Sequence, residues 1–383
     1  MMAHVLAQAS FPVRELELAT YLSRQHGRTQ HHLSASECET MALADLLALA
    51  DAEDAERWAR LRLGYTDPLG APWLRAAAAS GYDLVTKRDL VCFAGAQEAL
   101  YAALHALLAV GDHAIIVLPS YQSIETLTLG LCDVSGVALD AATGWSLDIA
   151  AVAAVIRPNT RMIAISFPNN PTGKQLEHDS FAALVELCRH HGIWLLSDEV
   201  YRLTERDPLR RLPHAADAYE RGISLGVLSK AYGLPGLRLG WVACRDGALM
   251  ERVATVRQYL STCNAGPSEV LATIALKAAP LIVARNRAIA EANLAELFSF
   301  FMQHDQLFDC YTPDGGVVCY PRYKGQGGVD RFAACMAETA GVLLLPASVF
   351  RSDLLELPAD RFRIGFGSFG FTAGLAAFRS ALV

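Results

Sequence analysis

Short apolar segments alternate with longer amphipathic segments through most of the chain. The apolar segments have the length of strands and cover residues 90–93, 114–118, 162–167, 193–197 and 223–228. Helical spacing of apolar residues marks the segments between them, at Gln97–Val110, Ile124–Leu131 and Phe181–His190. Such alternation is typical of a mostly parallel sheet with helices on its faces. The pattern therefore predicts an α/β fold.

The two ends of the chain depart from this alternation. Residues 1–33 are polar and irregular, whereas Cys38–Ala55 carries apolar residues at the spacing of a helix. A long helical pattern over about Ala279–Gln303 is followed by short strands and helices, which favours a smaller α+β domain. The predicted organisation is an N-terminal arm, a large domain and a small C-terminal domain, over residues 1–40, 41–283 and 284–383.

Composition narrows the class of protein. Of 383 residues, 52% are hydrophobic and 19% are charged, which excludes a disordered chain. The net charge of −7 and the lack of a basic run argue against a nucleic-acid partner. Nine cysteines without a Cys-x-x-Cys pair indicate reduced thiols, and the histidine pairs lack the spacing of metal ligands. Without a signal-peptide pattern or an apolar run approaching roughly 20 residues, we expect a cytoplasmic protein with no membrane partner.

One lysine lies at the end of an apolar strand. Lys230 follows residues 223–228 and precedes a turn that contains Gly233 and Pro235. Desolvation and a neighbouring cation, such as Arg238, lower the pKa of a lysine and make it a nucleophile that forms an imine with an aldehyde. Most lysines are surface groups, so Lys230 by itself does not indicate a catalytic site. Other segments must supply groups that fit the same chemistry.

Four further segments place candidate groups at strand ends. Asp198 follows a buried strand, where it could keep a pyridine nitrogen protonated. Gly95 leads from a strand into a helix whose first N–H groups suit a phosphate. Asn170 lies in a rigid turn, and Tyr121 could stack on a flat ring. Taken singly, each residue is equally well explained as a cap, a connection, a turn or a packed side chain.

The order and spacing of these segments resemble the class I/II aminotransferases, which belong to fold type I of the pyridoxal-phosphate enzymes. The resemblance rests on Ser-Lys-x-x-Gly-Leu-x-Gly-x-Arg-x-Gly at residues 229–240, Asn-Asn-Pro-Thr-Gly at 169–173 and Asp-x-x-Tyr at 198–201. It covers essentially the whole chain. It implies a large cofactor-binding domain, a smaller C-terminal domain and pyridoxal 5'-phosphate as the cofactor.

The resemblance also implies roles for single residues. Lys230 would hold the cofactor as an internal aldimine and, once released, move the proton between the substrate α-carbon and the cofactor. Asp198 would pair with the ring nitrogen, and Tyr121 would stack on the ring. Asn170 and Tyr201 would bond the 3-oxygen of the ring. Catalysis would thus depend on Lys230, Asp198 and Tyr201.

Two anion sites are implied in the same way. The phosphate site would comprise Gly95, Ala96, Gln97, Ser229 and Arg238. Many relatives have a serine where this chain has Val227, so phosphate binding is expected to depend more on Ser229 and Arg238. Arg363, together with Asn170, matches the group that binds the substrate carboxylate, and Arg361 is its competitor on the same strand.

Tyr65 resembles a tyrosine that reaches the phosphate of a neighbouring subunit. It lies in the pattern Tyr-x-x-x-x-Gly-x-x-x-Leu-Arg, formed by Tyr65, Gly70, Leu74 and Arg75. The resemblance therefore implies a homodimer in which each active site takes residues from both chains.

These expectations favour an aminotransferase that moves an amino group from an L-amino acid to a 2-oxo acid by a ping-pong mechanism. A lyase, oxidase or cyclase acting on a functionalised amino acid would use the same residues, so the sequence leaves these reactions open. A sensor module of a transcription regulator would need a DNA-binding domain ahead of the first packed helix. The pattern Gly-x-Gly-x-x-Gly at Gly365–Gly370 is the only sign of a nicotinamide-dependent dehydrogenase, and too few residues follow it to complete a dinucleotide-binding βαβ unit. Residues 23–40 and 257–268, which border the substrate in relatives, match no specificity pattern.

Overall fold

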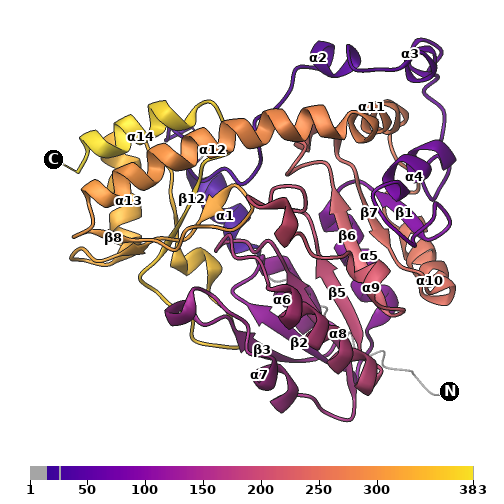
Figure 1. The fold of residues 1–383 in the computed structure, drawn as a ribbon, viewed down its shortest axis with the longest axis horizontal. Coiled ribbons are helices and arrows are strands. Elements are labelled where there is room, and N and C mark those ends of the chain that lie inside the picture. The colour runs from indigo at the N-terminus through magenta and orange to yellow at the C-terminus, as the bar shows by residue number, and fades with distance from the viewer. Residues whose placement is uncertain (1–14, 26, 383) are drawn as a thin grey trace, which may run out of the picture.

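A seven-stranded sheet forms the centre of the protein in the computed structural model, which describes residues 15–25 and 27–382 (Figure 1). The strand order is β1-β7-β6-β5-β4-β2-β3. The pairs are parallel except those of β7, which runs antiparallel to β6 and β1. The strands are β1 (Leu90–Phe93), β2 (His113–Leu118), β3 (Asp133–Ala138), β4 (Thr160–Ser166), β5 (Trp194–Asp198), β6 (Gly222–Val227) and β7 (Gly240–Ala243).

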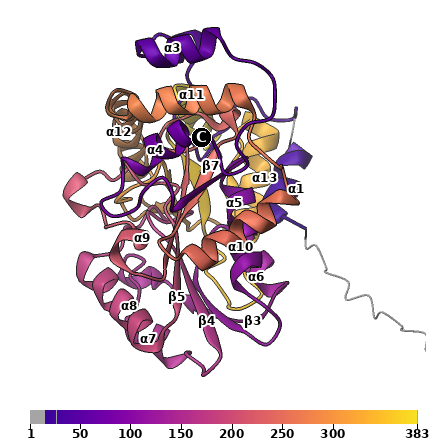
Figure 2. The same cartoon turned by 90° about the vertical axis from the view of Figure 1, so that its right-hand side faces the viewer.

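Helices cover both faces of this sheet, as the view along its layers shows (Figure 2). On β2, Ile115 and Val117 pack into one apolar cluster while Ile116 and Leu118 pack into another, as the two-residue period of a strand requires. The first cluster includes side chains of α7 (Ile149–Ala154), α8 (His178–His191) and α9 (Ala215–Ala218). The second includes side chains of α5 (Ala96–Leu107), α6 (Gln122–Leu129) and α10 (Gly247–Gln258). Burial on both faces explains why the strands read as continuous apolar runs.

The C-terminal elements form a smaller unit beside the sheet (Figure 1). The helix α12 (Ala279–Gln303) has the bounds that its pattern predicts, and it runs through the expected domain boundary at 283/284. Short strands and two helices follow it, namely β8 (Phe308–Asp309), β9 (Val318–Cys319), β10 (Arg322–Tyr323), α13 (Val329–Ala340), β11 (Leu345–Pro346), β12 (Phe362–Gly365) and α14 (Phe371–Ser380). The predicted α/β fold with a small α+β part is therefore confirmed.

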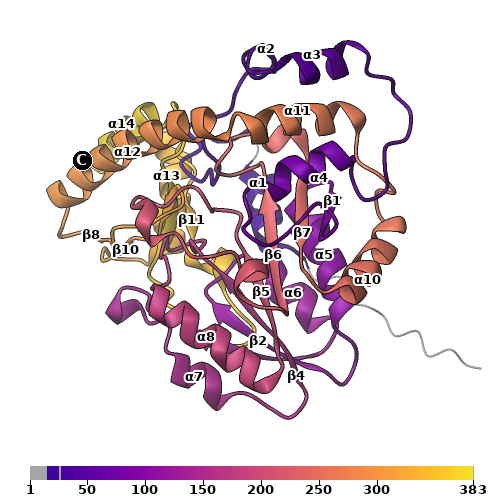
Figure 3. The ribbon, with the colours of Figure 1, turned by 45° about the vertical axis from the view of Figure 1, so that its right-hand side comes forward.

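The N-terminal part differs from the prediction in two places. The single helix expected over Cys38–Ala55 is wrong, because the chain forms α2 (Leu43–Leu47) and α3 (Ala52–Ala59), which lie on the outer side of α11 (Gly266–Lys277) (Figure 3). The Asp51 carboxylate accepts a hydrogen bond from the Asp54 N–H at 2.8 Å and so begins a new helix. The arm is not irregular throughout, because α1 (Glu17–Gln25) forms within it. Residues 1–14 of the predicted arm lie outside the described residues.

The strands β3 and β7 were absent from the predicted pattern, as were α7, α9, α10, α11 and one further helix. β3 lies at the edge of the sheet and is largely half-exposed, so its sequence lacks an apolar run. β7 has only four residues and follows the Gly- and Pro-containing turn after Lys230. The helix α4 (Pro72–Ala79) packs with α11 against β1 and β7 in a third apolar cluster. Within residues 15–25 and 27–382, no single helix is long and apolar enough to cross a membrane; α11 and α12 meet that test only as a pair bent by 78°.

Candidate active site

A cavity of about 260 Å³ lies where β4, β5 and β6 end. Parallel strands collect their carboxyl ends at one edge of a sheet, which is where α/β folds bind ligands. Predicted site residues from several segments line this cavity, namely Ala96, Gln97, Tyr121, Asn170, Asp198, Ser229, Lys230 and Arg238. Val227, which stands where many relatives have a serine, lines the cavity as well.

Lys230 reaches this cavity from the loop after β6. Its Nζ donates a hydrogen bond to Ser36 Oγ at 2.9 Å. Burial lowers the pKa of Lys230, and the Arg363 charge also lowers it, whereas Glu37 and Asp198 act in the opposite direction. A lowered pKa leaves more of the amine neutral and therefore nucleophilic at neutral pH.

Asp198 ends β5 and is 7% exposed. Burial raises the pKa of this carboxyl to about 6, although the Val200 N–H and Lys230 partly counter that effect. The Val200 N–H donates to Asp198 Oδ1 at 3.2 Å. A buried carboxylate of this kind gains stability from a cationic partner, and a protonated pyridine nitrogen in the cavity would be one. The residue thus fits the ring of pyridoxal phosphate.

The start of α5 offers an anion site. Gly95 precedes the helix with a φ of 98°, and the first N–H groups of a helix lack partners within it. A Cβ at Gly95 would lie 2.6 Å from Arg238 Nη2, so a side chain there would collide with the guanidinium. Arg238 itself has a φ of 48° and is held by the Pro235 and Ala94 carbonyls at 3.1 and 3.4 Å. Free N–H groups beside a guanidinium fit a phosphate.

Arg363 lies on β12 and is 2% exposed. Its Nη1 donates to Asn170 Oδ1 at 3.0 Å and its Nη2 donates to the Ser34 carbonyl at 2.6 Å. Its Nε has no hydrogen-bond partner, and no carboxylate of the described chain forms an ion pair with it. Burial lowers the pKa of Arg363, so an anion would relieve its desolvation.

Arg361, the competitor of Arg363, faces elsewhere. Its guanidinium lies 4.8 Å from the centre of the Trp145 ring, and Nη1 donates to the Tyr320 carbonyl at 3.3 Å. Neither neighbour lines the cavity. Of the two arginines, Arg363 is the one in contact with a cavity residue.

Four predicted residues do not line the cavity, namely Gly95 and Arg363, described above, and Tyr201 and Tyr65. Tyr201 is fully buried, and its hydroxyl donates to the Ser36 carbonyl at 2.7 Å, so it contacts the site through Ser36. Tyr65 is 94% exposed and lies outside the cavity.

The sequence did not single out Ser36, Leu18 or Glu199. Ser36 lies within residues 23–40, which border the substrate in relatives, but no pattern marks it or Leu18, and both line the cavity. Glu199 accepts hydrogen bonds from Ser224 Oγ at 2.8 Å and from the Ala215 N–H at 2.9 Å, and it pairs with His214. The consecutive acidic residues Asp198 and Glu199 were a usable signal, because neighbours on an extended chain point to opposite sides.

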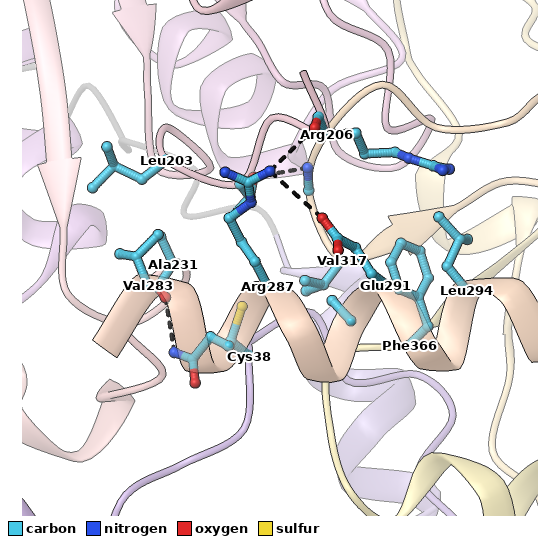
Figure 4. A pocket seen from close by; sticks show the side chains of 14 residues that line it. Cys38, Leu203, Arg206, Ala231, Val283, Arg287, Glu291, Leu294, Val317 and Phe366 are labelled. Carbon is cyan, nitrogen blue, oxygen red and sulfur yellow. Dashed lines mark hydrogen bonds and ion pairs between the residues drawn. The ribbon is translucent and has the colours of Figure 1, made fainter. Parts of the chain in front are cut away.

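The helix α12 fixes the loop that carries Lys230. The Asn286 side-chain amide donates to the Ala231 carbonyl at 2.9 Å, next to a small cavity of about 20 Å³ that Cys38 and Ala231 also line (Figure 4). The next residue, Arg287, donates to the Arg206 carbonyl at 3.1 Å and pairs with Glu291 at 3.5 Å. The lysine loop is therefore held by a helix that continues into the C-terminal unit.

Comparisons with known proteins agree with this geometry. Arginine–pyruvate transaminase AruH of Pseudomonas aeruginosa is 30% identical to this chain, and the match covers 75% of this chain and 74% of AruH. Capreomycidine synthase of Streptomyces vinaceus is 29% identical, and the match covers 78% of this chain and 75% of the synthase. The structure of a PLP-dependent aminotransferase from Streptococcus suis has a TM-score of 0.89 at 26% identity, covering 97% of this chain and 98% of that one. The PLP-dependent cyclase OrfR has a TM-score of 0.86 at 26% identity, covering 96% and 97%. Residues 28–373 match the model of aminotransferase class I and II, and the chain belongs to this family of pyridoxal-phosphate enzymes.

Proposed function

We propose that this protein transfers the amino group of an L-amino acid to a 2-oxo acid, with Lys230 as the amine that bonds the cofactor. The main support is that one cavity brings together the Lys230 amine with its lowered pKa, the buried Asp198 carboxylate and the start of α5. The buried Arg363 guanidinium contacts Asn170 at the wall of the same cavity. Bound pyridoxal phosphate supplies an aldehyde and an electron-withdrawing ring.

The proposed roles follow from where each side chain lies. The Lys230 amine would hold the cofactor through its aldehyde and, when free, would move a proton to and from the substrate α-carbon. The Asp198 carboxylate, which lines the cavity, would pair with the ring nitrogen and keep it protonated. Tyr121, which lines the cavity, would stack on the ring. Asn170, which lines the cavity, would bond the ring oxygen. The resemblance gives Tyr201 the same role, although its hydroxyl donates to the Ser36 carbonyl and reaches the cavity only through Ser36.

The anionic groups are held at two separate places. The N–H groups of Ala96 and Gln97, the Ser229 hydroxyl and the Arg238 guanidinium bind the phosphate. Arg363, with Asn170 beside it, binds the substrate carboxylate through its planar fork. Because both half-reactions use one lysine and one cavity, donor and acceptor must enter in turn, which predicts ping-pong kinetics.

The test is the visible absorbance of the protein with pyridoxal phosphate, recorded while L-amino acids are added one at a time. We expect a cofactor band that changes with particular amino acids, and stoichiometric consumption of a 2-oxo acid in turnover. Lys230→Ala should abolish the band of the covalently attached cofactor. A wild-type protein that takes up no pyridoxal phosphate would refute the proposal.

A second candidate is a lyase, oxidase or cyclase reaction on an amino acid with a functional side chain. Capreomycidine synthase and the cyclase OrfR, both similar to this chain over most of its length, favour the cyclase. These reactions consume an amino acid without a 2-oxo acid acceptor. Mass spectrometry of the products formed from each amino acid with the acceptor left out separates the cyclase from the transferase, while ammonia release or oxygen uptake marks a lyase or an oxidase.

We also propose a homodimer with composite sites. The support is the exposure of Leu63 and Tyr65, which are two residues apart in the chain, since large side chains exposed together are typical of a surface that a partner covers. We further propose a cytoplasmic location, because all nine cysteines are free thiols and five of them are buried. The division at residues 283 and 284 stays a prediction.

A further inference from the structure

The segment Ser34–Cys38 crosses the candidate active site and is fixed on several sides. Arg363 donates to the Ser34 carbonyl at 2.6 Å, and Tyr201 donates to the Ser36 carbonyl at 2.7 Å. The Cys38 N–H donates to the Lys230 carbonyl at 3.3 Å. The backbone on both sides of Ser36 therefore has little freedom, and its side chain is held at the cavity wall.

The Ser36 hydroxyl is hydrogen-bonded to the Lys230 amine. Ser36 Oγ accepts a hydrogen bond from Lys230 Nζ at 2.9 Å, and over residues 15–25 and 27–382 this is the hydrogen bond that Nζ makes. No ion pair ties Nζ to Glu37 or Asp198 in that part of the chain, although both carboxylates act on its charge. A neutral oxygen, rather than a carboxylate, is thus the partner of the amine.

We propose that the Ser36 hydroxyl is a further catalytic group, which holds one N–H of the Lys230 amine and stabilises the positive charge that the amine gains when it takes a proton. The inference rests on the proposed role of Lys230. In this step the α-carbon–hydrogen bond breaks, its electron pair stays with the carbon, and the proton forms a new N–H bond at Nζ. The hydroxyl keeps its own proton throughout.

The position of the oxygen gives it two effects. Holding one N–H at Oγ orients the rest of the amine, so its lone pair is available toward the cavity rather than toward Ser36. When the amine becomes an ammonium, the same hydrogen bond becomes charge-assisted and stronger. Ser36 therefore favours both the direction of attack and the protonated product.

The first test follows uptake of pyridoxal phosphate by the cofactor-free protein across a pH series, by visible absorbance. Because only the neutral amine bonds the aldehyde, the rate rises with pH and its midpoint reports the protonation of Lys230. Ser36→Ala removes an acceptor from the ammonium, so we expect the midpoint to move to lower pH by about one unit. None of the variants replaces the other titratable or charged groups around Lys230, namely Glu37, Cys38, Tyr121, Asp198, Tyr201, Arg238 and Arg363.

Further variants distinguish the effect of the Ser36 hydroxyl from any effect of disturbing the segment around it. Ser36→Thr retains the hydroxyl and should keep the wild-type midpoint, whereas Ser36→Gly should repeat the shift if Ser36→Ala does not fold. Thr40→Ala removes an exposed hydroxyl from the same part of the chain and should change nothing. Circular dichroism of each variant confirms that it is folded.

The second test uses the amino acid that reacts fastest in the absorbance panel, with and without deuterium at its α-carbon. Ser36→Ala should slow the single-turnover reaction about tenfold and enlarge the isotope effect, with little change in KM. Unchanged midpoints and isotope effects in Ser36→Ala and Ser36→Gly would overturn the role of Ser36 alone. A wild-type protein that bonds no pyridoxal phosphate would overturn the proposed function, and this inference with it.

Discussion

Asp198 combines a functional position with a cost in stability. Its pKa is raised from 3.8 to about 6, mainly by burial, so the folded chain without cofactor holds this proton more tightly than the unfolded chain does. Between about pH 4 and about pH 6 the free energy of unfolding therefore falls as the pH rises, and it stays reduced above that window. At about 1.4 kcal/mol per pKa unit, the cost is about 3 kcal/mol.

Replacing this carboxyl should therefore stabilise the cofactor-free protein. Asp198→Asn keeps the shape and removes the charge, so we expect it to raise the free energy of unfolding by up to about 3 kcal/mol at pH 7.5 and by much less at pH 4.5. Urea unfolding at the two pH values measures the difference. Asp207→Asn, at an exposed carboxylate, serves as the control, and equal effects of Asp198→Asn at both pH values would contradict the assignment.

The two arginines of residues 361–363 allow a matched comparison. Arg363→Lys loses the planar fork next to Asn170, so we expect kcat/KM for the amino acid substrate to fall roughly 100-fold, mostly through KM. Arg361→Lys, whose side chain lies on Trp145, should leave kcat/KM within about threefold. Steady-state kinetics of both variants decides, and a larger loss in Arg361→Lys would reverse the assignment.

Sequence reasoning predicted residues at strand ends better than residues from elsewhere. Lys230, Asp198 and Asn170 could be brought together because parallel strands end at one edge of the sheet. Ser36 could not, because it is 194 residues from Lys230 and the segment joins the site only through tertiary hydrogen bonds. Tyr65 is a different case, since a single chain leaves it exposed.

At the level of elements, α12 links the lysine loop to the C-terminal unit. Asn286 and Asn293 are buried on this helix, and each donates to backbone carbonyls, Asn286 to Ala231 and Asn293 to Phe366 and Ser368. Losing either amide leaves buried carbonyls without that donor, which costs about 1–3 kcal/mol. Both side chains are buried, but only Asn286 bonds the loop that carries Lys230.

This pair predicts separate effects on stability and on cofactor retention. Asn286→Ala and Asn293→Ala should each lower the free energy of unfolding by about 1–3 kcal/mol, measured in urea. Only Asn286→Ala, which frees the carbonyl after Lys230, should also speed the loss of pyridoxal phosphate during dialysis, severalfold against wild type. Equal cofactor loss from the two variants would show that α12 does not position the lysine loop.

Elements with a plain apolar period could be predicted, and those that depend on caps or edges could not. The bounds of α12 follow from its long pattern, whereas Asp51 splits the predicted helix over Cys38–Ala55 by capping α3. β3 was missed because an edge strand needs little apolar surface. The short β7 depends on its antiparallel pairing with β1 and β6, which no local pattern reveals.

At the scale of the whole molecule, the proposed composite site can be tested by mixing two inactive variants. Tyr65→Ala and Lys230→Ala would damage the same site from different chains if Tyr65 serves the neighbouring subunit. Random reassociation makes about half of the dimers hybrids, each with one intact site of two, so about a quarter of wild-type activity should return. Activity after refolding the variants together, against each refolded alone, is the measurement; no recovery would place both residues in one chain's site.

The central claim is that the cavity at the ends of β4, β5 and β6 holds pyridoxal phosphate on Lys230. Borohydride reduction of the protein with pyridoxal phosphate, followed by peptide mass mapping, tests it most directly, because reduction converts an imine into a stable bond to the lysine that formed it. We predict the cofactor mass on the peptide that contains Lys230, and its absence from Lys230→Ala. A label on another lysine, or no label at all, would contradict the account.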